Sequence, residues 1–276
     1  MHPQANKLKV YLYSSLSLSG ISAILYILCF VMSFDRTVNY FSASPLIYIT
    51  RTLLALSIAW TASLLILIPR DGLISTAPAY RSFSAKFAYV LTAAFIFSTF
   101  LHIRLITASI TSLLGSVAGA LVAAYTGMTA IYPDSKKAVR SLLGYAPIVW
   151  AFLSIIDAYF NTYVTMNSPM KLLLVFSMIF LMLFQIQEEG YSVDRGRPRM
   201  YAVFGLLSVM MSLAFSLSYF ICTLTGIYKI PEFMPTAIGS LAYAVYTVGR
   251  LFDMLSVSET NIVAENDTDT TENQDE

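Results

Sequence analysis

The uncharged stretch ITSLLGSVAGALVAAYTGMTAIY, residues 110–132, is long enough to cross a lipid bilayer as a single helix. A hydrocarbon core takes roughly 20 apolar residues at the rise of an α-helix. Within the stretch Gly115, Gly119, Ala123 and Gly127 recur every four residues and leave one ridge of the helix nearly bare. Such ridges let a second helix approach closely in a membrane. The stretch therefore predicts a transmembrane helix that packs tightly against a neighbour, or against a second copy of the chain.

Seven further apolar stretches of similar length surround this one. The predicted spans lie near residues 10–33, 46–69, 86–105, 110–132, 143–165, 170–187, 201–225 and 236–256. Overall 57% of the residues are apolar and only 12% are charged, against about 25% charged in soluble domains. The fold class is therefore all-α: a polytopic integral membrane protein with about eight transmembrane helices. The connection between the spans at 86–105 and 110–132 is short. Residues 86–132 could therefore also form one long helix followed by a re-entrant piece.

The chain divides into one membrane domain and two short tails. Residues 1–9 form a short N-terminal tail, 10–256 the single helical domain, and 257–276 an acidic tail. A segment with so few apolar residues cannot bury enough surface to fold, so we expect the last tail to be disordered. Cys29 and Cys222 fall inside predicted spans, which argues against a disulfide framework.

The distribution of Lys and Arg over the loops predicts the orientation. Eleven lie on one side: Lys7, Lys9, Arg70, Arg81, Lys86, Lys136, Lys137, Arg140, Arg195, Arg197 and Arg199. The opposite loops hold four: Arg36, Arg104, Lys171 and Lys229. Because cytoplasmic loops carry the excess of Lys and Arg, both termini are predicted to be cytoplasmic.

Asp157 in the fifth span is the first candidate site residue. It shares a helix face with Ser154 and Asn161, and the predicted boundaries place it several residues from either end. An ionised carboxylate there costs at least ~2.5 kcal/mol unless it finds a partner, a proton or water. Arg51 in the second span is expected at a similar depth. Two interpretations follow, a structural pair with Arg51 and an ion- or proton-binding site at Asp157.

The eighth span carries a second polar face, formed by Tyr243, Tyr246, Arg250 and Asp253. Arg250 and Asp253 are three residues apart, a spacing at which opposite charges on a helix touch. One interpretation is an interfacial pair in which Arg250 extends its charge to the water. The other is the wall of a ligand- or ion-binding cavity, to which the tyrosines contribute.

The sixth loop concentrates charge at the predicted cytoplasmic face, with Glu188, Glu189, Arg195, Arg197 and Arg199. Two glutamates at the C-terminal end of a helix are unfavourable unless cations lie near, which the arginines would supply. Arginines are also suited to phosphate because they donate hydrogen bonds in a fork. The cluster therefore predicts either local salt bridges or a site for anionic lipid head groups.

Several chemistries are excluded by composition. The two histidines allow no H-E-x-x-H zinc site, and the chain contains no G-x-S-x-G and no phosphate-binding Gly-x-x-x-x-Gly-Lys loop. The sequence implies no catalytic residue, no cofactor and no metal, and it carries no signal of nucleic-acid binding.

Three classes of function remain. The polar helix faces favour a small-solute or ion transporter, or a ligand-binding membrane protein, in the cell membrane. The second class is a membrane enzyme or binder that acts on anionic lipid head groups at the cytoplasmic face. The third is a structural or scaffolding subunit. Expected partners are the lipid bilayer, anionic lipid, and an oligomer formed through the small-residue face of the fourth span.

Overall fold

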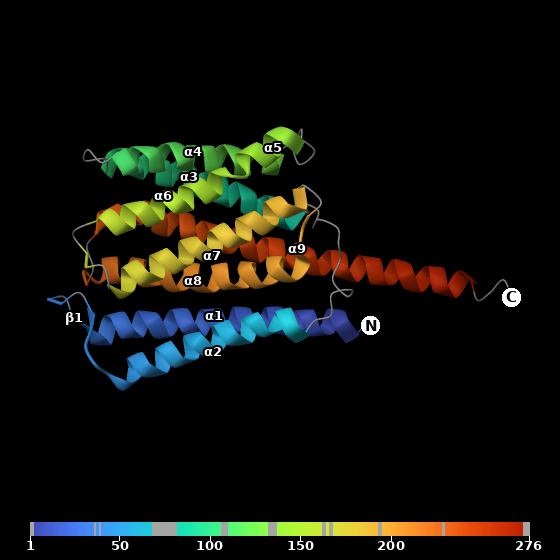
Figure 1. Ribbon diagram of the computed structural model, residues 1–276, viewed down its shortest axis with the longest axis horizontal. Coiled ribbons are helices and arrows are strands. Elements are labelled where there is room, and N and C mark those ends of the chain that lie inside the picture. Colours follow the sequence, from blue (N-terminus) through green and yellow to red (C-terminus); the bar gives the residue numbers. More distant parts are fainter. Residues whose placement is uncertain are drawn as a thin grey trace.

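The computed structural model shows an elongated helical bundle with both chain ends at the same end of the molecule (Figure 1). We call this end the terminal end and the other the hairpin end. The structure describes residues 3–35, 37–38, 40–67, 82–105, 110–131, 137–161, 164–165, 168–192, 195–227 and 230–272. The predicted second loop, with Arg70 and Arg81, lies outside these residues.

The described residues form helices joined by short connections. The elements are α1 (Pro3–Ser33), β1 (Phe34–Asp35), β2 (Tyr40–Phe41), α2 (Pro45–Leu67), α3 (Ser82–Leu105), α4 (Ile110–Ile131), α5 (Lys137–Leu143), α6 (Ala146–Phe160), α7 (Pro169–Ser192), α8 (Pro198–Leu224), the 3₁₀ turn η2 (Pro231–Phe233) and α9 (Met234–Glu272). The two-residue strands pair antiparallel and make a small hairpin between α1 and α2. Helices α2, α7 and α8 have proline at their first position, where the missing N–H costs no hydrogen bond.

The prediction of an all-α, multi-pass membrane protein is confirmed. Within the described ranges seven helices are long and apolar enough to cross a membrane: α1, α2, α3, α4, the α5–α6 segment Ser141–Phe160, α7 and α8. Within 86–132 the described residues form two separate full-length helices, α3 and α4, so the re-entrant alternative is wrong. The fifth span is shorter than predicted, because α6 ends at Phe160 and not near residue 165.

Helix α9 holds the predicted eighth span and differs from the other seven. It is too polar to count among the apolar spans, yet none of its residues from Met234 to Leu255 is exposed. It packs mainly against α3 and α8 inside the bundle. Helix α9 continues as one helix to Glu272, beyond the bundle (Figure 1), and the disorder of the tail stays a prediction. No proline or glycine follows Gly249 to end it.

The small-residue ridge of α4 is used inside the protein. A side chain at Gly115 would meet His102 of α3, one at Gly119 would meet Thr99, and one at Gly127 would meet Thr92. Helices α3 and α4 share the most extensive contact in the bundle. The predicted tight packing is therefore confirmed, with α3 as the partner of this ridge. A second row of small residues on α4, next to the glycine ridge, is partly exposed on the surface of the bundle, since Ala120 and Ala124 are exposed.

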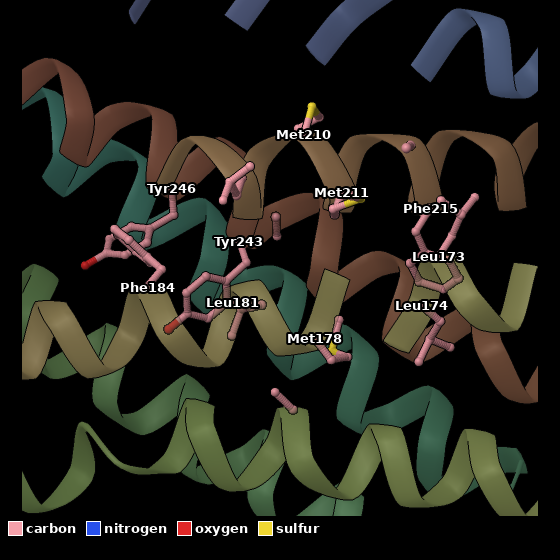
Figure 2. Packing of buried hydrophobic residues seen from close by; sticks show 14 of the residues in the cluster. Leu173, Leu174, Met178, Leu181, Phe184, Met210, Met211, Phe215, Tyr243 and Tyr246 are labelled. Carbon is pink, nitrogen blue, oxygen red and sulfur yellow. The ribbon is translucent and has the colours of Figure 1, made fainter. Parts of the chain in front are cut away.

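Buried aromatic and apolar side chains gather where α7, α8 and α9 meet. Figure 2 shows Tyr243 and Tyr246 of α9 beside Phe184 and Leu181 of α7, with Met210 and Met211 on α8. Deeper in the same region the hydroxyl of Ser177 lies 2.9 Å from those of Ser212 and Ser240, so one buried serine cluster joins three helices. Interhelical hydrogen bonds of this kind hold membrane helices together where burial from water no longer drives association.

Candidate functional site

A buried network of polar side chains lies between α4, α7, α8 and α9, toward the terminal end. We call it the inner polar cluster. It contains Tyr125, Gln185, Glu188, Glu189, Tyr201, Tyr243, Arg250 and Asp253, all of them buried. Several of these residues lie near helix ends. The same helices contribute aromatic and apolar residues to the rest of the core. Ionisable groups inside a membrane domain are costly unless they pair, and they mark functional sites by default.

Glu188 forms one half of the cluster with α8 and α9. Its Oε1 accepts hydrogen bonds from Nε and Nη2 of Arg250, at 2.8 and 2.7 Å, and its Oε2 accepts one from the Tyr201 hydroxyl at 2.5 Å. Asp253 lies on the other side of the guanidinium, with Oδ2 3.7 Å from Nη1. Both carboxylate oxygens of Glu188 are therefore engaged, Oε1 in a buried ion pair with α9 and Oε2 in a hydrogen bond with α8.

Glu189 forms the other half with α4 and the turn before α6. Successive residues of a helix point about 100° apart, so its side chain leaves α7 in a different direction. Its Oε1 accepts hydrogen bonds from the Tyr125 hydroxyl at 2.9 Å and from the Gln185 amide at 3.1 Å. The carboxylate lies directly against Gly144, where a Cβ would overlap it. Gly144 is thus required for this close approach.

Gln185 joins Glu189 to Tyr243 of α9. Its Nε2 donates to Glu189, and lies 3.3 Å from both the Tyr125 hydroxyl and the Gly144 carbonyl oxygen. Its Oε1 accepts a hydrogen bond from the Tyr243 hydroxyl at 2.7 Å. The amide is fully buried, so both of its polar ends are satisfied by protein. A continuous hydrogen-bonded path therefore runs from α9 through α7 to α4.

The structure brings together much of the face predicted on the eighth span. Tyr243, Arg250 and Asp253 all belong to the cluster, and Tyr246 packs edge-on against Tyr243 with ring centroids 5.7 Å apart. The interpretation of Arg250 as a side chain that reaches the water is wrong. Its side chain is 4% exposed and pairs with Glu188 from a different helix.

The charges predicted as one head-group site are separated. Glu188 and Glu189 point into the bundle, whereas Arg195 and Arg197 are exposed on the loop. Arg199 donates to the backbone carbonyl oxygen of Leu65 at 3.0 Å. The cation that compensates Glu188 comes from α9, 62 residues further along the chain, and not from the neighbouring arginines.

The predicted pair between Arg51 and Asp157 does not form. Arg51 is exposed on α2 and donates to the Tyr40 hydroxyl at 3.0 Å, while Asp157 accepts a hydrogen bond from Thr111 of α4 at 2.8 Å. Since α6 ends at Phe160, Asp157 lies in the last turn of its helix and not in mid-span. Its neighbour Ser154 bonds the carbonyl oxygen of Trp150 within the same helix at 2.9 Å.

Asn161 is the C-cap residue of α6 and contributes its backbone to a feature that the sequence did not reveal. The ammonium of Lys171 is buried and donates to the carbonyl oxygens of Tyr159, Asn161 and Val164, at 3.4, 3.0 and 3.3 Å. A cation at this position satisfies carbonyl groups that the helix leaves open and interacts favourably with its dipole. Lys171 therefore fixes the start of α7 to the end of α6.

Tyr125, Gln185 and Tyr201 are the cluster members that the sequence analysis did not single out as site residues. A tyrosine near the end of an apolar span gives no distinct signal, because tyrosine is common at the membrane interface, and a single glutamine matches no motif. Their role depends on Glu188 and Glu189, which only the fold brings to them.

The cluster offers hydrogen-bond acceptors from three carboxylates, donors from Arg250 and the tyrosines, and an amide that serves as both. Such a set can hold a proton, a small cation or a cationic group of a solute. The part of the chain that the structure describes contains no group of three His, Cys, Asp or Glu residues placed to bind a metal ion.

The fold and the cluster together define a multi-pass helical membrane protein with a buried polar interior. No family model, no curated protein and no solved structure matches the chain.

Proposed function

We propose that the protein is a membrane transporter for a small cationic solute or an ion, protons included, and that the inner polar cluster is its binding site. The observation that carries the proposal is the buried carboxylate of Glu189, which contacts α4 and the turn before α6 on one side and Gln185 on the other. If these ionisable and polar groups only stabilised the fold, apolar side chains would do so as well or better. Replacing buried ion pairs by apolar residues is often neutral or stabilising.

The position of Glu189 supports a transport site. Helices α3 to α6 form one group, in which α3, α4 and α6 pack on one another through α4. Helices α7, α8 and α9 are joined by the serine cluster and by the Glu188–Arg250 pair, and α9 also packs on α3 as extensively as on α8. Glu189 of α7 contacts Tyr125 of α4 and Gly144 before α6, so it lies where α7 meets the first group. Transporters bind their substrates between such groups, which then move relative to one another around the site.

The two glutamates take different roles in this proposal. Glu188 is held by a guanidinium and a tyrosine hydroxyl on its two oxygens, which suits a fixed structural pair. The hydroxyl and amide that bond Glu189 can reorient toward either an oxygen or a nitrogen atom, because hydroxyl groups both donate and accept. Glu189 is therefore the residue that we assign to binding.

The proposal includes the topology predicted from the sequence. We infer that α9 is an eighth crossing, that both termini are cytoplasmic, and that the protein resides in the cell membrane. An even number of crossings agrees with the two chain ends lying at one end of the bundle (Figure 1). It also agrees with the excess of Lys and Arg in the loops assigned to that side.

Flux into proteoliposomes tests the transport proposal. Purified protein is reconstituted with an internal pH-sensitive dye, and proton, sodium and potassium gradients are imposed in turn. We expect the wild type to dissipate at least one gradient faster than protein-free liposomes, and Glu189→Gln to abolish that flux while it stays monodisperse and folded. The matched control is Glu232→Gln, which removes a carboxylate near the hairpin end and outside the cluster, and should leave the flux unchanged.

Two results would overturn the proposal. A Glu189→Gln protein with the flux of the wild type would remove Glu189 from the site. A wild type no faster than empty liposomes with all three ions and with a panel of organic cations would favour the scaffolding class instead.

The exposed arginines suit a second, peripheral role. Arg195 and Arg197 stand on the loop at the terminal end, where the proposed topology places the anionic cytoplasmic leaflet. We propose that they contact anionic lipid there. An oligomer through α4 would have to use its open row at Ala120 and Ala124, because the glycine ridge is filled by α3.

A further inference from the structure

A groove on the outer surface, near the hairpin end, lies apart from the inner polar cluster. Helices α2 and α7 both pack on α8 without packing extensively on each other. The space between them is a cavity of about 400 Å³, with Tyr26 of α1 and Met211 of α8 at its floor. Ligand pockets typically occupy about 300–1,000 Å³, so the groove is large enough for part of a lipid-sized molecule.

One end of the groove carries a cation. Arg51 lines it, and the guanidinium donates to the Tyr40 hydroxyl at 3.0 Å and lies 6.0 Å from the centroid of the Tyr40 ring. Tyr40 thus orients the guanidinium while leaving most of its donors to other acceptors, since arginine carries five N–H groups. Arg51 is exposed, so an acceptor can approach from the membrane.

The rest of the groove is apolar and leads away from the charge toward the middle of the bilayer. On α2 the lining continues from Arg51 to Leu54 and Ile58, about 10 Å along the helix at 1.5 Å per residue. On α7 it continues from Leu172 to Phe176 and Phe180. Leu172 and Phe176 are 44% and 47% exposed, so the groove opens sideways to the lipid.

We propose that this groove binds a phospholipid with an anionic head group from the leaflet at the hairpin end. The charge complementarity selects the occupant: a phosphate meets the guanidinium of Arg51, which is suited to two parallel hydrogen bonds, and an acyl chain fills the apolar part. A free phosphate would satisfy Arg51 alone and would leave the apolar walls without a partner. The proposal does not depend on transport.

Binding of fluorescent lipids to the delipidated, detergent-purified protein tests the site. Phosphatidylglycerol and phosphatidylcholine with the same acyl chains are compared by fluorescence anisotropy, with glycerol phosphate as a competitor. We expect the wild type to prefer phosphatidylglycerol, and Arg51→Gln to weaken that lipid about tenfold, which corresponds to ~1.4 kcal/mol. Glycerol phosphate should not compete.

Two matched controls separate the groove from the general surface. Arg104→Gln removes another exposed arginine near the hairpin end, which stacks over Phe100 at 5.4 Å and lies outside the groove, and it should leave the preference intact. Leu172→Trp should weaken both lipids by filling the groove, whereas Leu113→Trp, at a comparably exposed site on α4, should not. Three results would each overturn the proposal. They are an equal loss of lipid affinity in a variant and its control, an Arg51→Gln variant that binds phosphatidylglycerol as the wild type does, and competition by glycerol phosphate.

Discussion

Helices α9 and α2 place an arginine in opposite surroundings. From Met234 to Leu255 α9 exposes no residue, and its Arg250 is enclosed with Glu188. Helix α2 exposes large apolar side chains along its length, such as Tyr48, Leu56 and Ile66, and its Arg51 faces the membrane surface. Lipid-facing helices must be apolar, whereas a helix surrounded by protein can be polar if its groups are paired. Here the helix too polar to count among the apolar spans is an interior one.

The largest expected difference concerns the two arginines themselves. Arg250→Leu leaves the buried carboxylate of Glu188 without its guanidinium, so we expect a loss of about 3–5 kcal/mol in the free energy of unfolding. Arg51→Leu, on an exposed position, should change it by no more than about 0.5 kcal/mol. Equilibrium unfolding in mixed micelles measures both. Similar losses in the two variants would show that Arg250 is not enclosed as described.

A second comparison uses glycines. A Cβ at Gly239 of α9 would lie 2.8 Å from the ring of Trp150 and 3.2 Å from Phe95, so Gly239→Ala should destabilise by about 1–3 kcal/mol through overpacking. Gly20 of α1 has nothing within 4 Å of its Cβ position. There alanine should stabilise by roughly 0.5–1 kcal/mol, because it loses less backbone entropy. Thermal melting of both variants beside the wild type gives the signs, and a stable Gly239→Ala would contradict the packing of α9.

One serine in each helix tests the comparison between α9 and α2 through a smaller change in stability. Ser240→Ala in α9 removes a hydrogen bond to Ser177 across two helices, which should cost about 0.6 kcal/mol. Ser63→Ala in α2 removes only a bond to the carbonyl oxygen of Trp60 in the same turn. We expect that change to be near zero. The same unfolding assay applies, and a larger loss at Ser63 than at Ser240 would reverse the ranking.

The smallest effect is expected at the hairpin beside α2, and it depends on pH. The Thr37 hydroxyl and backbone N–H bond the carboxylate of Asp35, at 2.6 and 2.8 Å, and hold its pKa below the ordinary value of 3.8. A lowered pKa in the folded state stabilises the fold above the unfolded-state pKa, and this contribution disappears as the pH falls through the folded-state pKa. Asp35→Asn should therefore melt slightly below the wild type at neutral pH. At strongly acidic pH the difference should vanish, and a difference that grows with acidity would contradict this assignment.

The sequence predicts the lipid-facing part of the fold well because hydropathy measures how favourably each helix lies in an apolar environment. Seven spans appear within a few residues of their predicted bounds. The end of α6 was missed because no proline or glycine occurs between Asn161 and Ser168 to mark it, and Asp157 was consequently placed too deep. The polar face of α9 was predicted from spacing alone.

The partners of that face could not be predicted. Arg250 of α9 meets Glu188 of α7 where both helices pack on α8, and no local pattern states which polar faces of two distant spans meet. For the same reason Arg51 and Asp157, paired because they were expected at a similar depth, are found on helices that do not pack extensively on each other. Depth can be estimated from a sequence, whereas the angular position of a helix in the bundle follows from the whole set of contacts.

The amide of Gln185 also determines what can pass between Glu189 and α9. An amide neither gains nor loses a proton near neutral pH, so the path from Tyr243 to Glu189 does not conduct protons although it is continuous in hydrogen bonds. If Glu189 binds a proton or a cation as proposed, the charge stays on the α4 side of this amide. Helix α9 could then sense it only through the orientation of the Gln185 amide, whose oxygen accepts the hydrogen bond of Tyr243.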